Sequence, residues 1–335
     1  MKIASFCSFV GDNEIGGGQT AAFQFREWCD ILGVECDVVT LKDNIGATVS
    51  KMGVTRFNNI EEIEAQYDFI LFVTPSFGIY IDYISLSIPY AVMIRGETDD
   101  VLFGGVDKIK EICKYAKVVI FNSPVYYGIR CDFVYCVMSP KYCIRENYSI
   151  DDKTILEKSG LVYSGRISKL KDAQALAKIT RDDEFLGSVG EVLVYGYYNS
   201  NSTRAGDLEG EISSICPRWT MMKEKLVTYD YEGMKINLID KQFIWEYSSV
   251  ITKRRFNIAC LEAMHFGCLP VVNRKAIPPK FAEKSYVFDP SEIKSVSENR
   301  RTDETYKMIE DLADSYYSFD NMLEMNANLI RKIME

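Results

Sequence analysis

Apolar and polar positions alternate along the chain in blocks that predict strands and helices in turn. Residues 2–10 are an apolar run of strand length, and a loop rich in glycine follows. Apolar side chains then recur at the spacing of one helix face, at Ala22, Phe25, Cys29 and Leu32. A second apolar run over 36–41 completes a strand–helix–strand unit. Such a unit predicts parallel strands joined by a right-handed crossover.

Three further apolar runs continue this pattern in the first part of the chain. They predict strands over 68–74, 90–94 and 118–122, and the periodicity over 101–116 predicts a helix. Strands that are apolar on both faces are typical of parallel sheets covered by helices on both sides. We therefore expect residues 1–145 to form one doubly wound, Rossmann-like domain.

A second series of the same kind follows a stretch of mixed charge over 146–158, which is the expected linker. Its predicted strands are 161–164, 191–195, 226–229 and 243–247. We expect a second Rossmann-like domain over 159–310, and a C-terminal helix over 311–335 that is able to cross back to the first domain. The predicted fold class is α/β, with two doubly wound domains facing each other across a cleft.

The segment 253–272 concentrates the candidate chemistry. It predicts a short helix that ends at Gly267 and is followed by a buried strand. Three cations stand at the start of this helix, where the helix dipole favours an anion. Glu262 is the one carboxylate among apolar neighbours such as Met264, and it is able to accept hydrogen bonds from two vicinal ribose hydroxyls. The alternative is a surface acid that pairs with a lysine.

A glycine-rich segment near the N-terminus suits a phosphorylated ligand. Gly16, Gly17, Gly18 and Gln19 lie between a strand and a helix, where backbone N–H groups can approach a phosphate, although a simple tight turn explains them equally well. Their spacing is not the dinucleotide fingerprint, so nicotinamide binding is not expected.

Cations and carboxylates also follow predicted strands. Arg166 and Lys171 come after the first strand of the second domain, where a guanidinium fork and a point charge can bind a diphosphate. A solvated basic turn is the alternative. Glu97 and Asp99 follow the strand over 90–94, as candidate catalytic carboxylates or as a polar loop that caps the next helix.

Composition narrows the class of protein. Hydrophobic residues are 47% and charged residues 26% of the chain, and the net charge of −9 argues against a general nucleic-acid binder. Ten cysteines without a CxxC pair, and a single histidine, His265, argue against a zinc site and a disulfide framework. No apolar run approaches the roughly 18 residues that a membrane span needs. We expect a cytoplasmic protein with reduced cysteines and no membrane insertion.

These motifs together resemble the retaining GT-B glycosyltransferases of the glycogen-synthase and sucrose-synthase type. The resemblance rests on the glycine loop, on Gly165-Arg166 with Lys171, and on Leu261-Glu262-Ala263 with the glycine and proline that follow. It implies that the glycine loop faces the donor sugar, that the arginine and lysine bind the donor diphosphate, and that the glutamate holds the nucleotide ribose. Gly196 and Asn257 are expected to line the same donor site.

Two departures from the family are informative. Arg254 stands where the family usually carries a second glutamate, eight residues before the ribose glutamate, and this exchange is similar to the bacteriophage DNA α-glucosyltransferases. The helix segment 24–28 is similar to that group too. The family's usual histidine in the first domain is missing, and Glu97 and Asp99 occupy the corresponding loop. The resemblance thus implies a specialised transferase, expressed in a host cytoplasm if a phage encodes it.

The expected reaction is transfer of a sugar from a nucleoside-diphosphate sugar, with uridine as the expected base, to an acceptor hydroxyl with retention. No metal is expected to be required, because two cations already neutralise the diphosphate. The favoured acceptor is a hydroxymethylated base in DNA, which requires a base flipped out of the duplex. A cell-envelope saccharide or lipid remains an alternative acceptor. A nucleotide-sugar epimerase and a ligand-binding protein without catalysis remain alternatives of other classes. The oligomeric state stays open.

Overall fold

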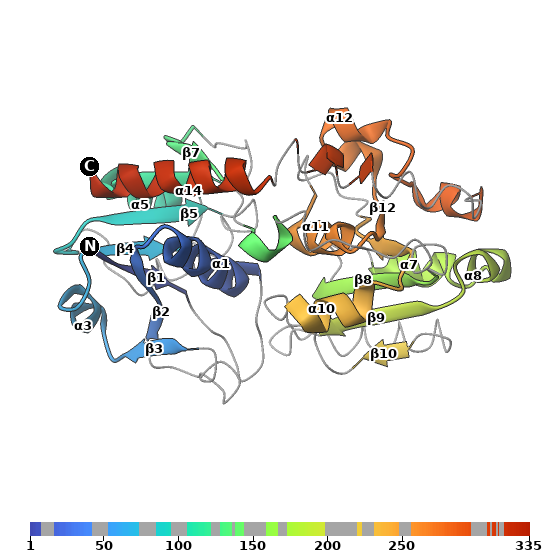
Figure 1. The fold of residues 1–335 in the computed structure, drawn as a ribbon, viewed down its shortest axis with the longest axis horizontal. Helices are drawn as coiled ribbons and strands as arrows, with labels where there is room; N and C mark the ends of the chain where they lie inside the picture. The colour runs from blue at the N-terminus through green and yellow to red at the C-terminus, as the bar shows by residue number, and fades with distance from the viewer. Residues whose placement is uncertain are drawn as a thin grey trace. The chain divides into compact units, whose positions relative to one another are not determined.

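The structure is a computed structural model of the 335-residue chain. It describes residues 1–7, 17–41, 53–73, 85–94, 106–121, 128–135, 138–143, 159–166, 173–197, 220–222, 231–247, 256–295, 307–308, 310–312, 314 and 318–335. The chain divides into two compact units: unit 1 comprises Met1–Cys143 and Tyr317–Glu335, and unit 2 comprises Ile144–Tyr316. Both termini therefore belong to unit 1 (Figure 1).

A parallel sheet forms the centre of unit 1. Its described strands are β1 (Lys2–Phe6), β2 (Glu35–Leu41), β3 (Val54–Phe57), β4 (Phe69–Phe72), β5 (Tyr90–Ile94), β6 (Val118–Phe121) and β7 (Phe133–Val134). Their order is β3-β2-β1-β4-β5-β6-β7, and each neighbouring pair is parallel. All residues of β4, β5 and β6 are buried, as expected for strands covered on both faces.

Helices complete unit 1. They are α1 (Gly17–Ile31), α3 (Ile60–Glu64), α5 (Val106–Tyr115), the 3-10 helix η2 (Pro140–Tyr142) and α14 (Phe319–Met334). Helix α14 packs beside α1 (Figure 1). The Trp28 and Phe319 rings lie 5.4 Å apart, and Nε1 of Trp28 donates a 2.6 Å hydrogen bond to the Met138 carbonyl oxygen. Trp28 thus holds both the segment before η2 and the start of α14 within unit 1.

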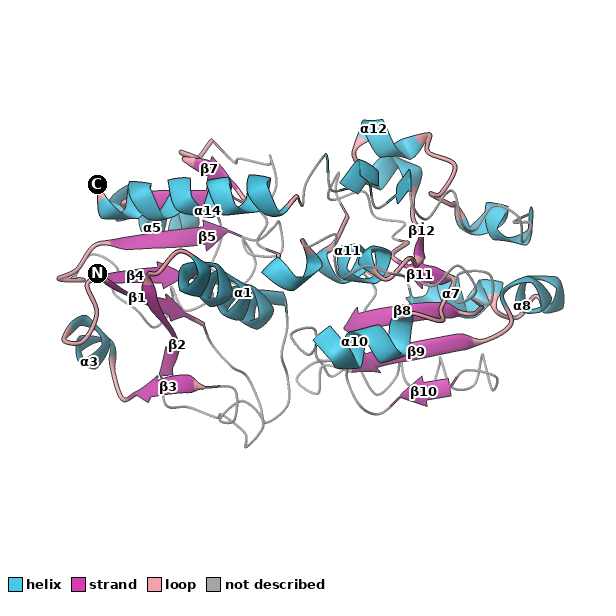
Figure 2. Cartoon of the chain, in the orientation of Figure 1, coloured by secondary structure: helices cyan, strands magenta, loops and turns pink. Residues whose placement is uncertain are grey.

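The sheet of unit 2 repeats the same plan with fewer strands. The described strands are β8 (Leu161–Arg166), β9 (Val192–Tyr197), β10 (Thr220–Met222), β11 (Phe243–Trp245) and β12 (Leu269–Val271). They lie in the order β10-β9-β8-β11-β12 and all neighbours are parallel (Figure 2). The first strand of the unit is flanked on one side by the second strand and on the other by the fourth, which is also the arrangement around β1 in unit 1.

Short helices connect these strands or follow the last of them. They are α7 (Ala173–Ile179), α8 (Asp183–Val189), α10 (Tyr231–Leu238), α11 (Ile258–His265) and α12 (Pro279–Ala282), with 3-10 helices η5 (Arg274–Ala276) and η6 (Pro290–Ser295). None of the helices in the described ranges is long and apolar enough to cross a membrane.

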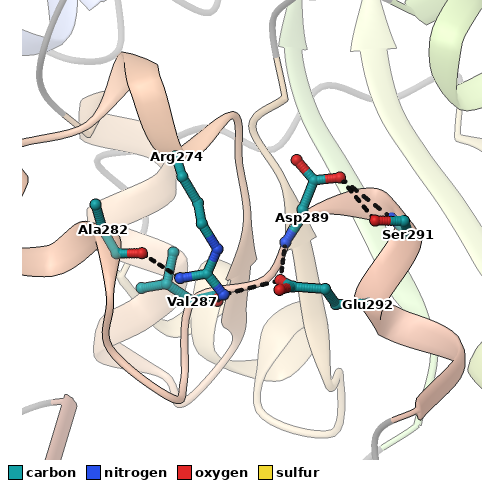
Figure 3. A network of polar contacts seen from close by, with 6 residues as sticks. All are labelled: Arg274, Ala282, Val287, Asp289, Ser291 and Glu292. Carbon is teal, nitrogen blue, oxygen red and sulfur yellow. Dashed lines mark hydrogen bonds and ion pairs between the residues drawn. The ribbon is translucent and has the colours of Figure 1, made fainter.

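A polar network holds the segment after β12 (Figure 3). The Arg274 guanidinium donates to the carbonyl oxygens of Ala282 and Val287, the latter at 2.5 Å, and lies 2.8 Å from the Glu292 carboxylate. The backbone N–H of Asp289 donates to the same Glu292 oxygen at 2.6 Å. Burial raises the pKa of Glu292, but these hydrogen bonds and the nearby guanidinium outweigh burial and leave the pKa below its ordinary value. One arginine therefore ties η5, α12 and η6 together.

The predicted parallel α/β architecture is confirmed, although several element boundaries differ. The helix expected over 101–116 is described over Val106–Tyr115, and the strand expected over 243–247 ends at Trp245. The strand expected over 226–229 falls outside the described residues. The sequence pattern did not predict β3 or β7, because these strands are short, lie at the two edges of the sheet and carry polar or exposed side chains.

Candidate functional site

Strand order marks one edge of each sheet as the place for a ligand. In a doubly wound sheet, ligands bind at the carboxyl ends of the strands, where the order of connection reverses. In unit 2 this reversal lies between β8 and β11. In unit 1 it lies between β1 and β4. The residues that follow these four strands are therefore the first candidates for a functional site.

In unit 2 this edge contains the backbone of two predicted residues. Arg166 is the last residue of β8 and pairs in register with Tyr197 of β9, while Gly165 pairs with Gly196. The side chain of Arg166 and the whole of Lys171 lie outside the described residues. The structure thus brings the backbones of Arg166 and Gly196 to the same edge of the sheet. Their contacts with a donor remain predictions.

Helix α11 begins at the same edge, after β11. Asn257 is its N-cap, and its Oδ1 accepts a 3.2 Å hydrogen bond from the Ala259 N–H. Every residue from Cys260 to His265 is buried, and α11 packs against β8, β11 and β12. Glu262 lies in the middle of this buried helix with 0% of its surface exposed. A fully buried carboxylate is costly unless polar groups surround it, so Glu262 is the strongest chemical feature of unit 2.

Glu246, which the sequence did not single out, joins this edge. It follows β11 directly, and its N–H donates a 2.9 Å hydrogen bond to the Val271 carbonyl oxygen. Its Oε1 accepts a 2.6 Å hydrogen bond from Nδ2 of Asn257. The sequence feature that could have indicated Glu246 is its position as the first charged residue after the apolar run of β11. Recognising that place as important required the strand order, because only the order makes β11 the neighbour of β8.

His265, the only histidine, lies at the end of α11. It is 8% exposed, and its Nε2 is 3.1 Å from the Tyr231 hydroxyl oxygen. Both rings also contact Phe266, and burial raises the pKa of the Tyr231 hydroxyl. These contacts join α10 to α11 and place His265 in the packing between the two helices.

The candidates of unit 1 are described only in part. Gly17, Gly18 and Gln19 form the first turn of α1, which follows β1 at the reversal point. Gly16 lies outside the described residues. Glu97 and Asp99 follow β5 in the sequence and also lie outside them, as does Arg254 before α11. Within the described ranges, no group of three or more histidine, cysteine, aspartate or glutamate side chains is arranged to hold a metal ion.

Solved structures share this architecture over nearly the whole chain. One is an alpha-glucosyltransferase in complex with UDP-glucose and DNA containing an abasic site, with a TM-score of 0.63, 14% identity and coverage of 97% of this chain and 94% of that chain. Another is HepE of Anabaena in complex with UDP, with a TM-score of 0.68, 12% identity and coverage of 99% and 100%. The chain has the GT-B fold.

A third GT-B structure, a glycosyltransferase from Rickettsia africae, matches with a TM-score of 0.61 and 13% identity over 100% of this chain and 98% of that chain. No family model matches the chain, and no curated protein matches it in sequence. The predicted GT-B fold with two Rossmann-like domains is thus confirmed, and the likeness to these proteins is one of fold.

Proposed function

We propose that the protein is a glycosyltransferase that moves a sugar from a UDP-sugar to an acceptor hydroxyl. The observation that carries the proposal is Glu262, a fully buried carboxylate in the helix that begins at the reversal point of the unit 2 sheet. The similar alpha-glucosyltransferase was solved with UDP-glucose and with UDP, and so was HepE. A carboxylate at this place suits the two hydroxyls of a ribose.

The donor diphosphate would lie between the start of α11 and the end of β8. Negative charge grows on the leaving diphosphate as the glycosidic bond breaks, and fixed cations stabilise that charge most strongly where water is excluded. We assign this role to Arg166 and Lys171, together with Arg254, which precedes α11 in the sequence. Gly196, one residue before the end of β9, would let the donor approach the backbone, because glycine has no side chain.

Retention follows from a reaction on one face of the sugar. The oxygen of the acceptor hydroxyl bonds to the anomeric carbon, the bond to the diphosphate breaks, and the leaving phosphate oxygen takes the acceptor's proton. This step needs no enzymic nucleophile. Glu97 or Asp99 would orient the acceptor hydroxyl or the sugar, and the turn from Gly16 to Gln19 would face the sugar.

Our preferred acceptor is a hydroxymethylated base in DNA. The support is the similarity to an alpha-glucosyltransferase solved with DNA, together with Arg254 in place of the usual acid. A saccharide acceptor is the second candidate. It is favoured by the net charge of −9, which opposes binding to a polyanion.

Release of UDP from UDP-glucose tests the activity. The purified chain is incubated with UDP-glucose and, in turn, with hydroxymethylated DNA, unmodified DNA and a panel of oligosaccharides. Release only with hydroxymethylated DNA supports the preferred acceptor, and the anomeric configuration of the product, read by NMR, tests retention. Tight binding of UDP-glucose without release under any condition would favour a binding protein. Interconversion of the sugar without transfer would favour an epimerase.

Two substitutions test the assignment of the diphosphate site. R166A and K171A should each lower kcat by about 10²-fold or more, because each removes a cation from the leaving group. Their thermal unfolding should match that of the unsubstituted protein. Near-normal turnover in both variants would remove Arg166 and Lys171 from the site.

A further inference from the structure

We propose that Glu246 is a positioning residue that fixes the start of helix α11 through Asn257, and thereby sets where the donor diphosphate binds. The inference rests on the proposed function, since it concerns the same helix. It assigns a task to a residue that follows β11 and has no role in the reaction outlined above.

The two hydrogen bonds of Asn257 define its orientation. Its Oδ1 accepts from the Ala259 N–H at 3.2 Å, and its Nδ2 donates to Oε1 of Glu246 at 2.6 Å. The opposite orientation of the amide would place its NH2 group against a backbone N–H and its oxygen against a carboxylate oxygen. A single orientation therefore satisfies both partners.

Glu246 is itself held by the sheet. Its N–H donates to the Val271 carbonyl oxygen at the end of β12, so its backbone continues the pairing of β11 with β12 beyond the strand. The link from Glu246 through Asn257 to Ala259 thus joins the rigid carboxyl edge of the sheet to the first turn of α11. The partial positive charge of a helix falls off within its first turn, so the placement of this turn decides where an anion is stabilised.

The charge of Glu246 makes this arrangement informative. A carboxylate near the start of a helix competes with a bound diphosphate, and removing that charge alone should tighten binding of an anion. If positioning is the function of Glu246, a substitution that removes the charge but keeps the hydrogen bond should differ from one that removes both.

The matched pair E246Q and E246A provides this test. Both variants remove the same charge, but the glutamine amide oxygen is still able to accept from Asn257, whereas alanine is not. We expect E246Q to bind UDP at least as tightly as the unsubstituted protein, and E246A to bind UDP at least fivefold more weakly than E246Q, measured by calorimetry. Uridine, which lacks the diphosphate, should bind both variants equally. The KM for UDP-glucose should rise in E246A with a smaller change in kcat.

Exchanging the donor and the acceptor between positions 246 and 257 controls for a folding defect in E246A. N257D keeps a good N-cap but loses the amide donor and faces Glu246 with a second carboxylate. In the double variant E246Q/N257D, the glutamine amide donates to the aspartate, which restores the link with the original net charge. We expect N257D to weaken UDP binding by at least fivefold and the double variant to recover it to within twofold.

Equal UDP affinities of E246A and E246Q, or no recovery in the double variant, would overturn the proposal while leaving the proposed function intact. Failure of the unsubstituted protein to bind UDP would instead overturn the proposed function, and the assignment of Glu246 with it.

Discussion

Helices α1 and α11 each follow a strand that borders the reversal point of its sheet, but they use buried polar side chains differently. In α1, the buried indole of Trp28 donates to the Met138 carbonyl oxygen, and its ring contacts Phe319. These contacts hold segments of the chain together. In α11, the side chain of Glu262 is fully buried. Burying a carboxylate opposes folding, so the comparison suggests that α1 serves stability and α11 serves binding.

The largest effect that this comparison predicts concerns Trp28. W28A should lower the free energy of unfolding by about 3–5 kcal/mol, because a large cavity forms in unit 1. W28F keeps most of the volume but leaves the Met138 carbonyl oxygen without the indole donor, so it should cost about 1–3 kcal/mol. Denaturant unfolding measures both. Stability unchanged in W28A would contradict the structural role of α1.

Substitution of Glu262 should affect ligand binding rather than stability, the opposite of what is expected for Trp28. E262Q keeps the shape of the side chain but removes the charge, so UDP binding should weaken by about 10- to 100-fold, as expected for lost hydrogen bonds to a charged group. The free energy of unfolding should change by less than about 1 kcal/mol, because glutamine keeps the shape of the side chain and still accepts hydrogen bonds. Calorimetry with UDP and thermal unfolding measure the two quantities, and E283Q, at an exposed glutamate, is the control. Loss of stability with intact UDP binding would make Glu262 a structural residue.

Arg274 tests whether every polar residue of unit 2 behaves like Glu262. R274A removes the donor to Ala282, Val287 and Glu292, and should lower the free energy of unfolding by about 1–3 kcal/mol. R274K should recover only part of this loss, because an ammonium group lacks the guanidinium fork. UDP affinity should change less than twofold in both. A tenfold loss of UDP affinity in R274A would extend the binding site to the network of Figure 3.

The smallest effect concerns Glu27 on α1. Burial raises its pKa above the ordinary value of 4.5, against the hydrogen bond from Ser139 and the charge of Lys141. A carboxyl group with a raised pKa in the folded state costs stability at pH values above that pKa and costs nothing below the pKa of the unfolded state. E27Q should therefore raise the free energy of unfolding at pH 7 and leave it unchanged near pH 3. E61Q, at an exposed glutamate, should show no such difference.

Some residues of the candidate site could be predicted from local sequence patterns, and others could not. The acid in an apolar helix, Glu262, could be predicted because the helical period and its interruption by one carboxylate lie within a few turns. Asn257 was expected only to line the donor site, and its role as N-cap comes from the structure. Glu246 could not be predicted in the same way, since its partner Asn257 lies 11 residues further along the chain and its importance depends on β11 being the neighbour of β8.

The sequence by itself determined the parallel α/β plan of both units, because buried apolar runs and helical periods are properties of short segments. Only the tertiary structure decided the edge strands β3 and β7, the side-chain contacts that hold α14 in unit 1, and the link between Glu246 and Asn257. Each of these depends on contacts between residues far apart in the chain, as between Tyr135 and Asn326. Such contacts follow from strand order and packing, which the propensities of single segments do not encode.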